Sequence, residues 1–142
     1  MRYTIAFLLV IGVAGSLQAQ LISEKQVPVT IQQALKKLHP TVQNLQWERS
    51  TPYYEAIFTL NNNHRAIKFD TKGQVAETEV GIPIATLPAS IAAYMKAHYP
   101  KERIQAAETV TKANSEKTYE IRITGMEVVF SSTGKFLEEE KD

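Results

Sequence analysis

Two stretches of the chain begin alike: VPVTIQQALKKLHP (residues 27–40) and LPASIAAYMKAHYP (residues 87–100). Both place apolar side chains at the spacing of one helix face, namely Ile31, Ala34, Leu35 and Leu38 in the first and Ile91, Tyr94 and Met95 in the second. A proline suits the start of a helix, and a later proline pushes the residue before it out of the α region. Each stretch therefore predicts one amphipathic helix between two prolines.

The similarity continues beyond the predicted helices. Alternating residues predict half-buried strands at Tyr54, Ala56 and Phe58, and again at Tyr119, Ile121 and Ile123. The alignment of the two halves changes register only in predicted turns, at residues 61–63 and 112–116. Gly73 and Gly134 each end a "Phe-x-x-x-Gly" segment and predict turns with a positive φ.

These patterns predict an α+β fold of two tandem repeats, each with one helix followed by about four antiparallel strands. The helices would pack on one sheet face, and two such sheets could join edge to edge with the far face open. The expected divisions are a signal peptide at 1–19, a linker at 20–26, a first repeat at 27–82 and a second repeat at 83–142.

The first residues have the order of a secretory signal peptide. Arg2 supplies a positive charge, an apolar run follows, and small residues lead to an expected cleavage after Ala19. The apolar run is shorter than the roughly 20 residues that span a bilayer, so no stable membrane anchor is expected after the leader is removed. We therefore predict a periplasmic or secreted protein. The chain has no cysteine, so neither a disulfide nor a lipid-modified cysteine is available to it.

The overall charge gives no indication of a partner. The chain has 16 basic and 15 acidic residues, and the leader holds only Arg2, so the mature chain carries equal numbers of each. A balanced charge provides no electrostatic footprint for nucleic acid, and we expect no nucleic-acid partner. The acidic run Glu138, Glu139 and Glu140 is explained adequately as a solvated terminus.

Loose sequence motifs recur along the chain: the proline-bounded helix, Trp47-Glu48, a tyrosine-containing strand and the hairpin from Ile67 to Gly73. With these motifs the chain resembles the PepSY-like family of exported bacterial proteins, which are described as similar to β-lactamase inhibitory protein. The second half departs from the pattern, with Ala107 at the tryptophan position and Ser131 at the aspartate position. The resemblance implies helix-plus-sheet lobes with a concave sheet surface and a binding or inhibitory role.

Catalytic signatures are missing from the sequence, and we predict that the protein is not an enzyme and needs no cofactor. There is no G-x-S-x-G motif and no glycine-rich phosphate loop, and the three histidines, His39, His64 and His98, do not have the spacing of metal ligands. Glu77 and Glu79 share one strand face, as two catalytic carboxylates can, but a solvated strand edge has the same pattern. Trp47, the single tryptophan, is expected in the core rather than at a binding hot spot.

Two functions from different classes remain. The first is a non-catalytic binding module of the cell envelope, in the form of a protein inhibitor acting on another envelope or secreted protein through an open sheet face. The alternative is a carrier or sensor of a small apolar or peptide ligand, which requires an apolar cavity. The candidate partner-binding face consists of the strand residues predicted to point away from the helices: Glu55, Ile57, Thr59, Lys68, Glu120, Arg122 and Thr124.

Overall fold

The computed structural model describes residues 19–141, so the predicted signal peptide lies almost entirely outside the described residues. Two ten-residue helices, α1 (Val29–Leu38) and α2 (Ala89–His98), each precede a run of strands. The strands are β1 (Gln20–Ile22), β2 (Gln43–Ser50), β3 (Tyr53–Leu60), β4 (Asn63–Phe69), β5 (Val75–Gly81), β6 (Ala106–Lys112), β7 (Lys117–Ile123), β8 (Met126–Ser131) and β9 (Phe136–Lys141). β1 lies in the segment expected to be a linker.

The strands form one continuous antiparallel sheet of nine strands, in which spatial order follows chain order from β1 to β9. The predicted fold class, two tandem repeats of a helix and about four strands, is therefore wrong. β5 pairs with β6 across the expected boundary, with Glu79 opposite Val110. An unpaired strand edge leaves its N–H and C=O groups without partners, and this pairing satisfies both inner edges at once.

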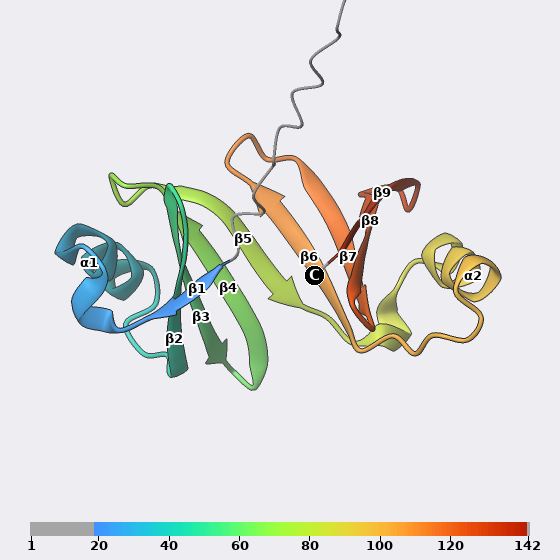
Figure 1. Cartoon of the computed structure of the whole chain (residues 1–142), viewed down its shortest axis with the longest axis horizontal. Helices are drawn as coiled ribbons and strands as arrows, with labels where there is room; N and C mark the ends of the chain where they lie inside the picture. The colour runs from blue at the N-terminus through green and yellow to red at the C-terminus, as the bar shows by residue number, and fades with distance from the viewer. Residues whose placement is uncertain (1–18, 142) are drawn as a thin grey trace, which may run out of the picture.

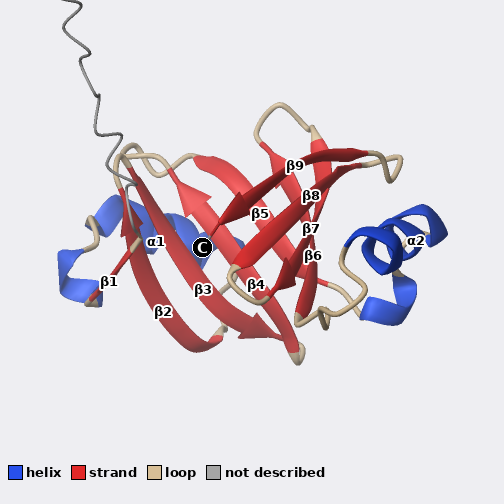
Figure 2. Ribbon diagram, turned by 45° about the vertical axis from the view of Figure 1, so that its right-hand side comes forward, coloured by secondary structure: helices blue, strands red, loops and turns tan. Residues whose placement is uncertain are grey.

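The two predicted helices are confirmed. α1 begins directly after Pro28 and ends with His39 as its C-cap, and α2 begins directly after Pro88 and ends with Tyr99 as its C-cap. Both helices lie outside the curved sheet, at opposite ends of the molecule (Figures 1 and 2). The sheet between them therefore has one face covered near each end by a helix and another face that no helix covers.

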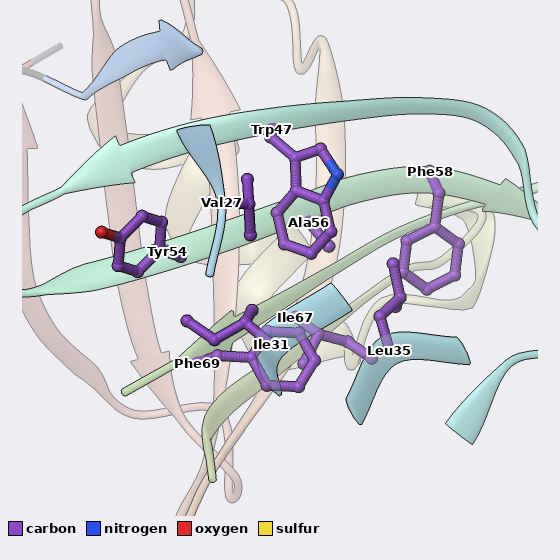
Figure 3. Close-up of a cluster of buried hydrophobic side chains, with 9 residues drawn as sticks. All are labelled: Val27, Ile31, Leu35, Trp47, Tyr54, Ala56, Phe58, Ile67 and Phe69. Carbon is purple, nitrogen blue, oxygen red and sulfur yellow. The ribbon is translucent and has the colours of Figure 1, made fainter. Parts of the chain in front are cut away.

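α1 holds its end of the sheet through a compact apolar cluster. Ile31 and Leu35 of the helix pack with Trp47, Ala56, Phe58, Ile67 and Phe69 of β2, β3 and β4 (Figure 3). Phe69 and Ile31 are fully buried, and Trp47 is 3% exposed, which confirms its predicted place in the core. Burying side chains of this size contributes about 1.5–3 kcal/mol each, so this cluster fixes which face of β2–β4 points inward.

α2 packs in the same way at the other end, where Ile91 and Met95 contact Ala107, Ile121, Ile123, Val128 and Phe130. An aromatic group extends this cluster to the edge strand, because the ring of Tyr94 stacks on Phe136 of β9 with centroids 5.0 Å apart. The strand register from β4 to β7 places Ile67 and Ile121 on the same side of the sheet. Both helices therefore cover the same face and leave the other face to solvent.

The turns before β5 and β9 confirm one detailed prediction, because Gly73 and Gly134 both have φ of +80°. Each turn also packs against the first turn of a helix. A Cβ at Gly73 would lie 3.3 Å from the Thr30 carbonyl oxygen, and one at Gly134 would lie 2.2 Å from Ser90 Oγ. These glycines therefore serve both the turn and the helix contact.

Gly73→Val is expected to lower the free energy of unfolding by more than about 1 kcal/mol, because the new side chain would combine a strained φ with a contact to the backbone carbonyl oxygen of Thr30, which cannot rotate away. Gly125→Val is the matched control, since Gly125 also has a positive φ but no neighbouring atom lies within 4 Å of its Cβ position. Urea denaturation should show a clearly smaller loss for Gly125→Val. Equal losses would mean that the helix contact contributes nothing.

Candidate binding cleft on the open sheet face

The open face of the sheet is hollowed into a cleft of about 860 Å³ that is lined by side chains from β2 to β9. Curvature brings distant strands to one concavity, so side chains such as Glu55, Ile57 and Glu120 are half-buried although no helix covers them. The strand register determines which side chains are neighbours on the floor of the cleft. Glu55 lies opposite Lys68, and Lys68 lies opposite Glu77.

Glutamate dominates the lining of the cleft. Its acidic residues are nine glutamates: Glu48, Glu55, Glu77, Glu79, Glu116, Glu120, Glu127, Glu138 and Glu140. A tenth, Glu108, lines the neighbouring hollow. Against these stand Lys68, Lys112 and Arg122, together with His64. The cleft is therefore strongly acidic, although the chain as a whole carries a formal charge of only +1.

Five of the seven residues of the predicted partner-binding face line this cleft: Glu55, Ile57, Lys68, Glu120 and Arg122. Thr59 is placed on the same face, opposite His64, but outside the lining. Thr124 follows the end of β7, and its Oγ1 accepts a hydrogen bond of 3.1 Å from Gln105 Nε2. The structure thus gathers most of the predicted residues in one place and excludes the two threonines.

Most of the glutamates were missed by the sequence analysis. The sequence pattern of Glu77 and Glu79 is that of a solvated strand edge, and that of Glu138 and Glu140 is that of a solvated terminus, yet all four line the cleft. Their spacing was the available signal, because residues two apart on a strand share a face. That signal does not say which other strands contribute to the same face, which depends on the sheet order.

Lys68 lies centrally among the carboxylates. Its Nζ donates a hydrogen bond of 2.8 Å to Glu77 Oε1, and both side chains are largely buried. Burial alone would lower the pKa of Lys68, but the Glu77 contact and the charges of Glu55 and Glu79 outweigh it, and the pKa is raised. Lys68 is therefore held as a cation. Lys112 lies only within 3.9 Å of Glu116, and both of these side chains are about half exposed.

A second carboxylate group lies on β6–β8, where Glu108, Glu120 and Glu127 bring one oxygen each to within 4.8 Å of one another. Three oxygens at this separation are a ligand set for a hard cation. Arg122 already lies against them, with Nη2 donating to Glu127 Oε1 at 2.7 Å and lying 3.8 Å from Glu108 Oε2. The guanidinium thus supplies positive charge where a metal ion would.

Several cleft carboxyls hold their protons unusually tightly. Burial raises the pKa of Glu79 to about 9, and the charge of Glu55 adds to this effect. Burial also raises the pKa of Glu55, against the opposing charge of Lys68, and raises that of Glu120 to about 7 with a contribution from Glu127. Glu55 and Glu79 hydrogen-bond to each other, which requires one of the two carboxyls to carry a proton. The cleft therefore has more carboxylates than its own cations balance.

The three histidines lie in separate places. His64 lies in the cleft, with Nε2 3.4 Å from Glu108 Oε1. His39 packs against Phe58 at the end of α1, where burial and the nearby Arg65 charge lower its pKa. His98 stacks on Tyr94 with ring centroids 4.0 Å apart. They do not converge on one site.

A family model described as "Putative beta-lactamase-inhibitor-like, PepSY-like" matches residues 52–138. The match covers more than half of the chain, and the chain therefore belongs to this PepSY-like family. No curated protein matches it. The family description names no enzyme.

Solved structures with the same fold come from Bacteroides. A "BLIP-like protein" from Bacteroides fragilis NCTC 9343 is 26% identical with a TM-score of 0.61, and the alignment covers 80% of this chain and 85% of that chain. A "putative periplasmic" protein from Bacteroides eggerthii DSM 20697 is 20% identical with a TM-score of 0.70, covering 81% and 88%. A DUF2874 family protein from Bacteroides uniformis ATCC 8492 is 20% identical with a TM-score of 0.69, covering 80% and 88%. In the part of this chain that the structure describes, no helix has the length and hydrophobicity needed to span a bilayer.

Proposed function

We propose that this member of the PepSY-like family is an exported, non-catalytic binding module that holds a segment of a partner protein in the cleft. The observation that carries the proposal is the cleft itself. It has a volume of about 860 Å³ and lies on the uncovered, concave face of a continuous sheet. Side chains on paired strands are already fixed in position, so binding costs little ordering of the receptor.

The likeness to a BLIP-like protein favours inhibition as the form that binding takes. An inhibitor has to be rigid, and the cleft floor meets this requirement because its residues lie within strands that are paired on both sides. A place in the periplasm, or outside the cell, agrees with the periplasmic description of a protein with the same fold. The partner would then be another envelope or secreted protein.

A carrier of a small apolar ligand receives less support. Ligand pockets of that kind are enclosed and mostly apolar, whereas this cleft is open and lined mainly by charged and polar side chains. A neighbouring hollow of about 520 Å³ has apolar walls from Ile82, Pro83 and Ile84, but it is more open still. Neither hollow would enclose an apolar molecule.

Site-specific cross-linking tests the proposal without assuming the chemistry of the partner. A photoreactive benzoylphenylalanine in place of Ile57, on the cleft floor, is expected to form a discrete adduct with an envelope protein on irradiation of whole cells. The same group in place of Lys36, on the exposed side of α1, is the control. Mass spectrometry should identify a partner peptide attached only at position 57. Adducts from position 36 alone would place the binding surface on the helices and contradict the proposal.

A further inference from the structure

We propose that the partner segment held in the cleft is basic, with several lysine or arginine side chains that pair with the glutamates of the floor. This inference rests on the proposed function and names the chemistry of the partner. Its basis is the separation of charge between the two sides of the sheet, which the balanced composition of the chain conceals.

The cleft collects most of the acidic residues of the protein. Nine of the 15 acidic residues line it, but only three of the 16 lysines and arginines do so. A concave surface with one sign of charge and low-dielectric walls concentrates the electric field and attracts ions of the opposite sign. A basic segment is therefore drawn to this face and not to the helix-covered face.

The cations of the cleft do not neutralise it. Lys68 Nζ lies 2.8 Å from Glu77 Oε1, and Arg122 Nη2 lies 2.7 Å from Glu127 Oε1. Beside the cleft, Glu108 lines the neighbouring hollow, where its carboxylate lies 3.4 Å from His64 Nε2 and 3.8 Å from Arg122 Nη2. These distances exceed the roughly 2.7–2.9 Å of a charge-assisted hydrogen bond, so Arg122 is not held by Glu108 as closely as by Glu127.

Protons occupy the places that cations of the partner would take. Glu55 and Glu79 share a hydrogen bond that needs a proton between two carboxyls, and the pKa of Glu79 is raised to about 9, mainly by burial. An ammonium or guanidinium group that arrives between them would favour the ionised form of both carboxyls and displace this proton. Binding of the basic segment is therefore coupled to proton release.

The shape of the cleft favours a polypeptide over a small polyamine. Sites for small molecules usually enclose 70–90% of the ligand, whereas this cleft is open along the sheet and has residues of eight strands in its walls. Nucleic acid is excluded by its charge. No phenylalanine, tyrosine or tryptophan is among the described residues that line the cleft, so the recognised groups are charged ends of side chains rather than flat apolar rings.

Isothermal titration calorimetry with ten-residue oligolysine, in low salt at pH 8, tests the inference on the mature protein. Oligolysine is expected to bind the wild-type protein, and ten-residue oligoglutamate is not. The isosteric variant Glu79→Gln with Glu120→Gln is expected to weaken oligolysine binding at least tenfold. Glu24→Gln with Glu102→Gln, two exposed positions outside the cleft, replaces the same number of carboxyls and should change the affinity by less than about twofold.

Titration of the wild type in buffers of different ionisation enthalpy should show proton release that the cleft variant lacks. Equal weakening by the two double variants would show only non-specific attraction and overturn the inference. If spermidine or calcium ions bound as tightly as oligolysine, the ligand of the cleft would be a small cation and not a polypeptide, and the inference would be wrong. An absence of oligolysine binding, with cross-linking at position 57 intact, would refute the basic partner and leave the proposed function standing.

Discussion

Ile121→Lys is expected to leave the protein unfolded at neutral pH, whereas Ile57→Lys is expected to leave it folded. Ile121 is fully buried in β7 under α2, where an ammonium group would find no partner and the apolar contacts of the isoleucine would be lost. Loss of these contacts costs about 2–5 kcal/mol, and an unpaired buried charge adds several more. Together these costs approach the free energy of unfolding of a typical domain, which is about 5–15 kcal/mol.

Ile57 is the matched position because it is also an isoleucine in the middle of a strand, but it points into the cleft. A lysine there would keep its ammonium in water or among Glu55 and Glu79. Circular dichroism during urea denaturation should show a cooperative transition for Ile57→Lys and none for Ile121→Lys. The reverse result would mean that the assignment of the two sheet faces is inverted.

The local elements of this fold could be predicted because their signals are local. Pro28 and Pro40 bound α1 in the sequence, and the apolar spacing between them defines the buried side of the helix. Alternation along residues 54–58 likewise indicated that Tyr54, Ala56 and Phe58 face the core, and all three are buried. Signals of this kind depend on neighbours within a few residues.

The single sheet could not be predicted by the same reasoning. The pairing of β5 with β6 is made by backbone groups, and nothing in Val75–Gly81 specifies which strand lies beside it. For this reason the fold class was wrong although both helices and the buried sides of the strands were right. Strand pairing between distant segments is a property of the whole chain.

The acidic cleft was hidden for a related reason. Equal numbers of acidic and basic residues suggest a balanced surface. Which charged residues share a sheet face depends on the pairing register of every strand, and the composition does not contain this information. Glu79 and Glu120 come together because β5, β6 and β7 are consecutive neighbours and because both point away from the helices. Neither residue has a sequence feature that marks it as part of a site.

Crowded carboxylates also carry a cost in stability, which depends on pH. The pKa of Glu79 is about 9 in the folded protein against an ordinary value of 4.5, with burial as the main cause and the charge of Glu55 next. The folded state therefore binds the proton of Glu79 more tightly than the unfolded state does. By linkage, stability falls as the pH rises from about 4.5 to about 9, and Glu120 contributes in the same direction up to about pH 7.

Glu79→Gln is accordingly expected to stabilise the protein, and to do so more strongly at higher pH. The amide has nearly the shape of the protonated carboxyl, can donate the hydrogen bond to Glu55 at every pH, and never becomes charged in the cleft. At pH 5 the variant and the wild type should differ little, because folded Glu79 is already protonated. At pH 8 the variant should be more stable by about 2 kcal/mol, a figure well below the full shift because water enters an open cleft.

Urea denaturation at several values between pH 5 and pH 8.5 measures this difference, with Glu24→Gln as the control at an exposed position outside the cleft. The control should follow the wild type within about 0.5 kcal/mol throughout. Curves for Glu79→Gln and wild type that run parallel from pH 5 to pH 8.5 would show that Glu79 is not held protonated by its surroundings. A difference that widens with pH would show that the glutamates of the cleft reduce the stability of the empty protein, as expected of a surface whose countercharges come from a partner.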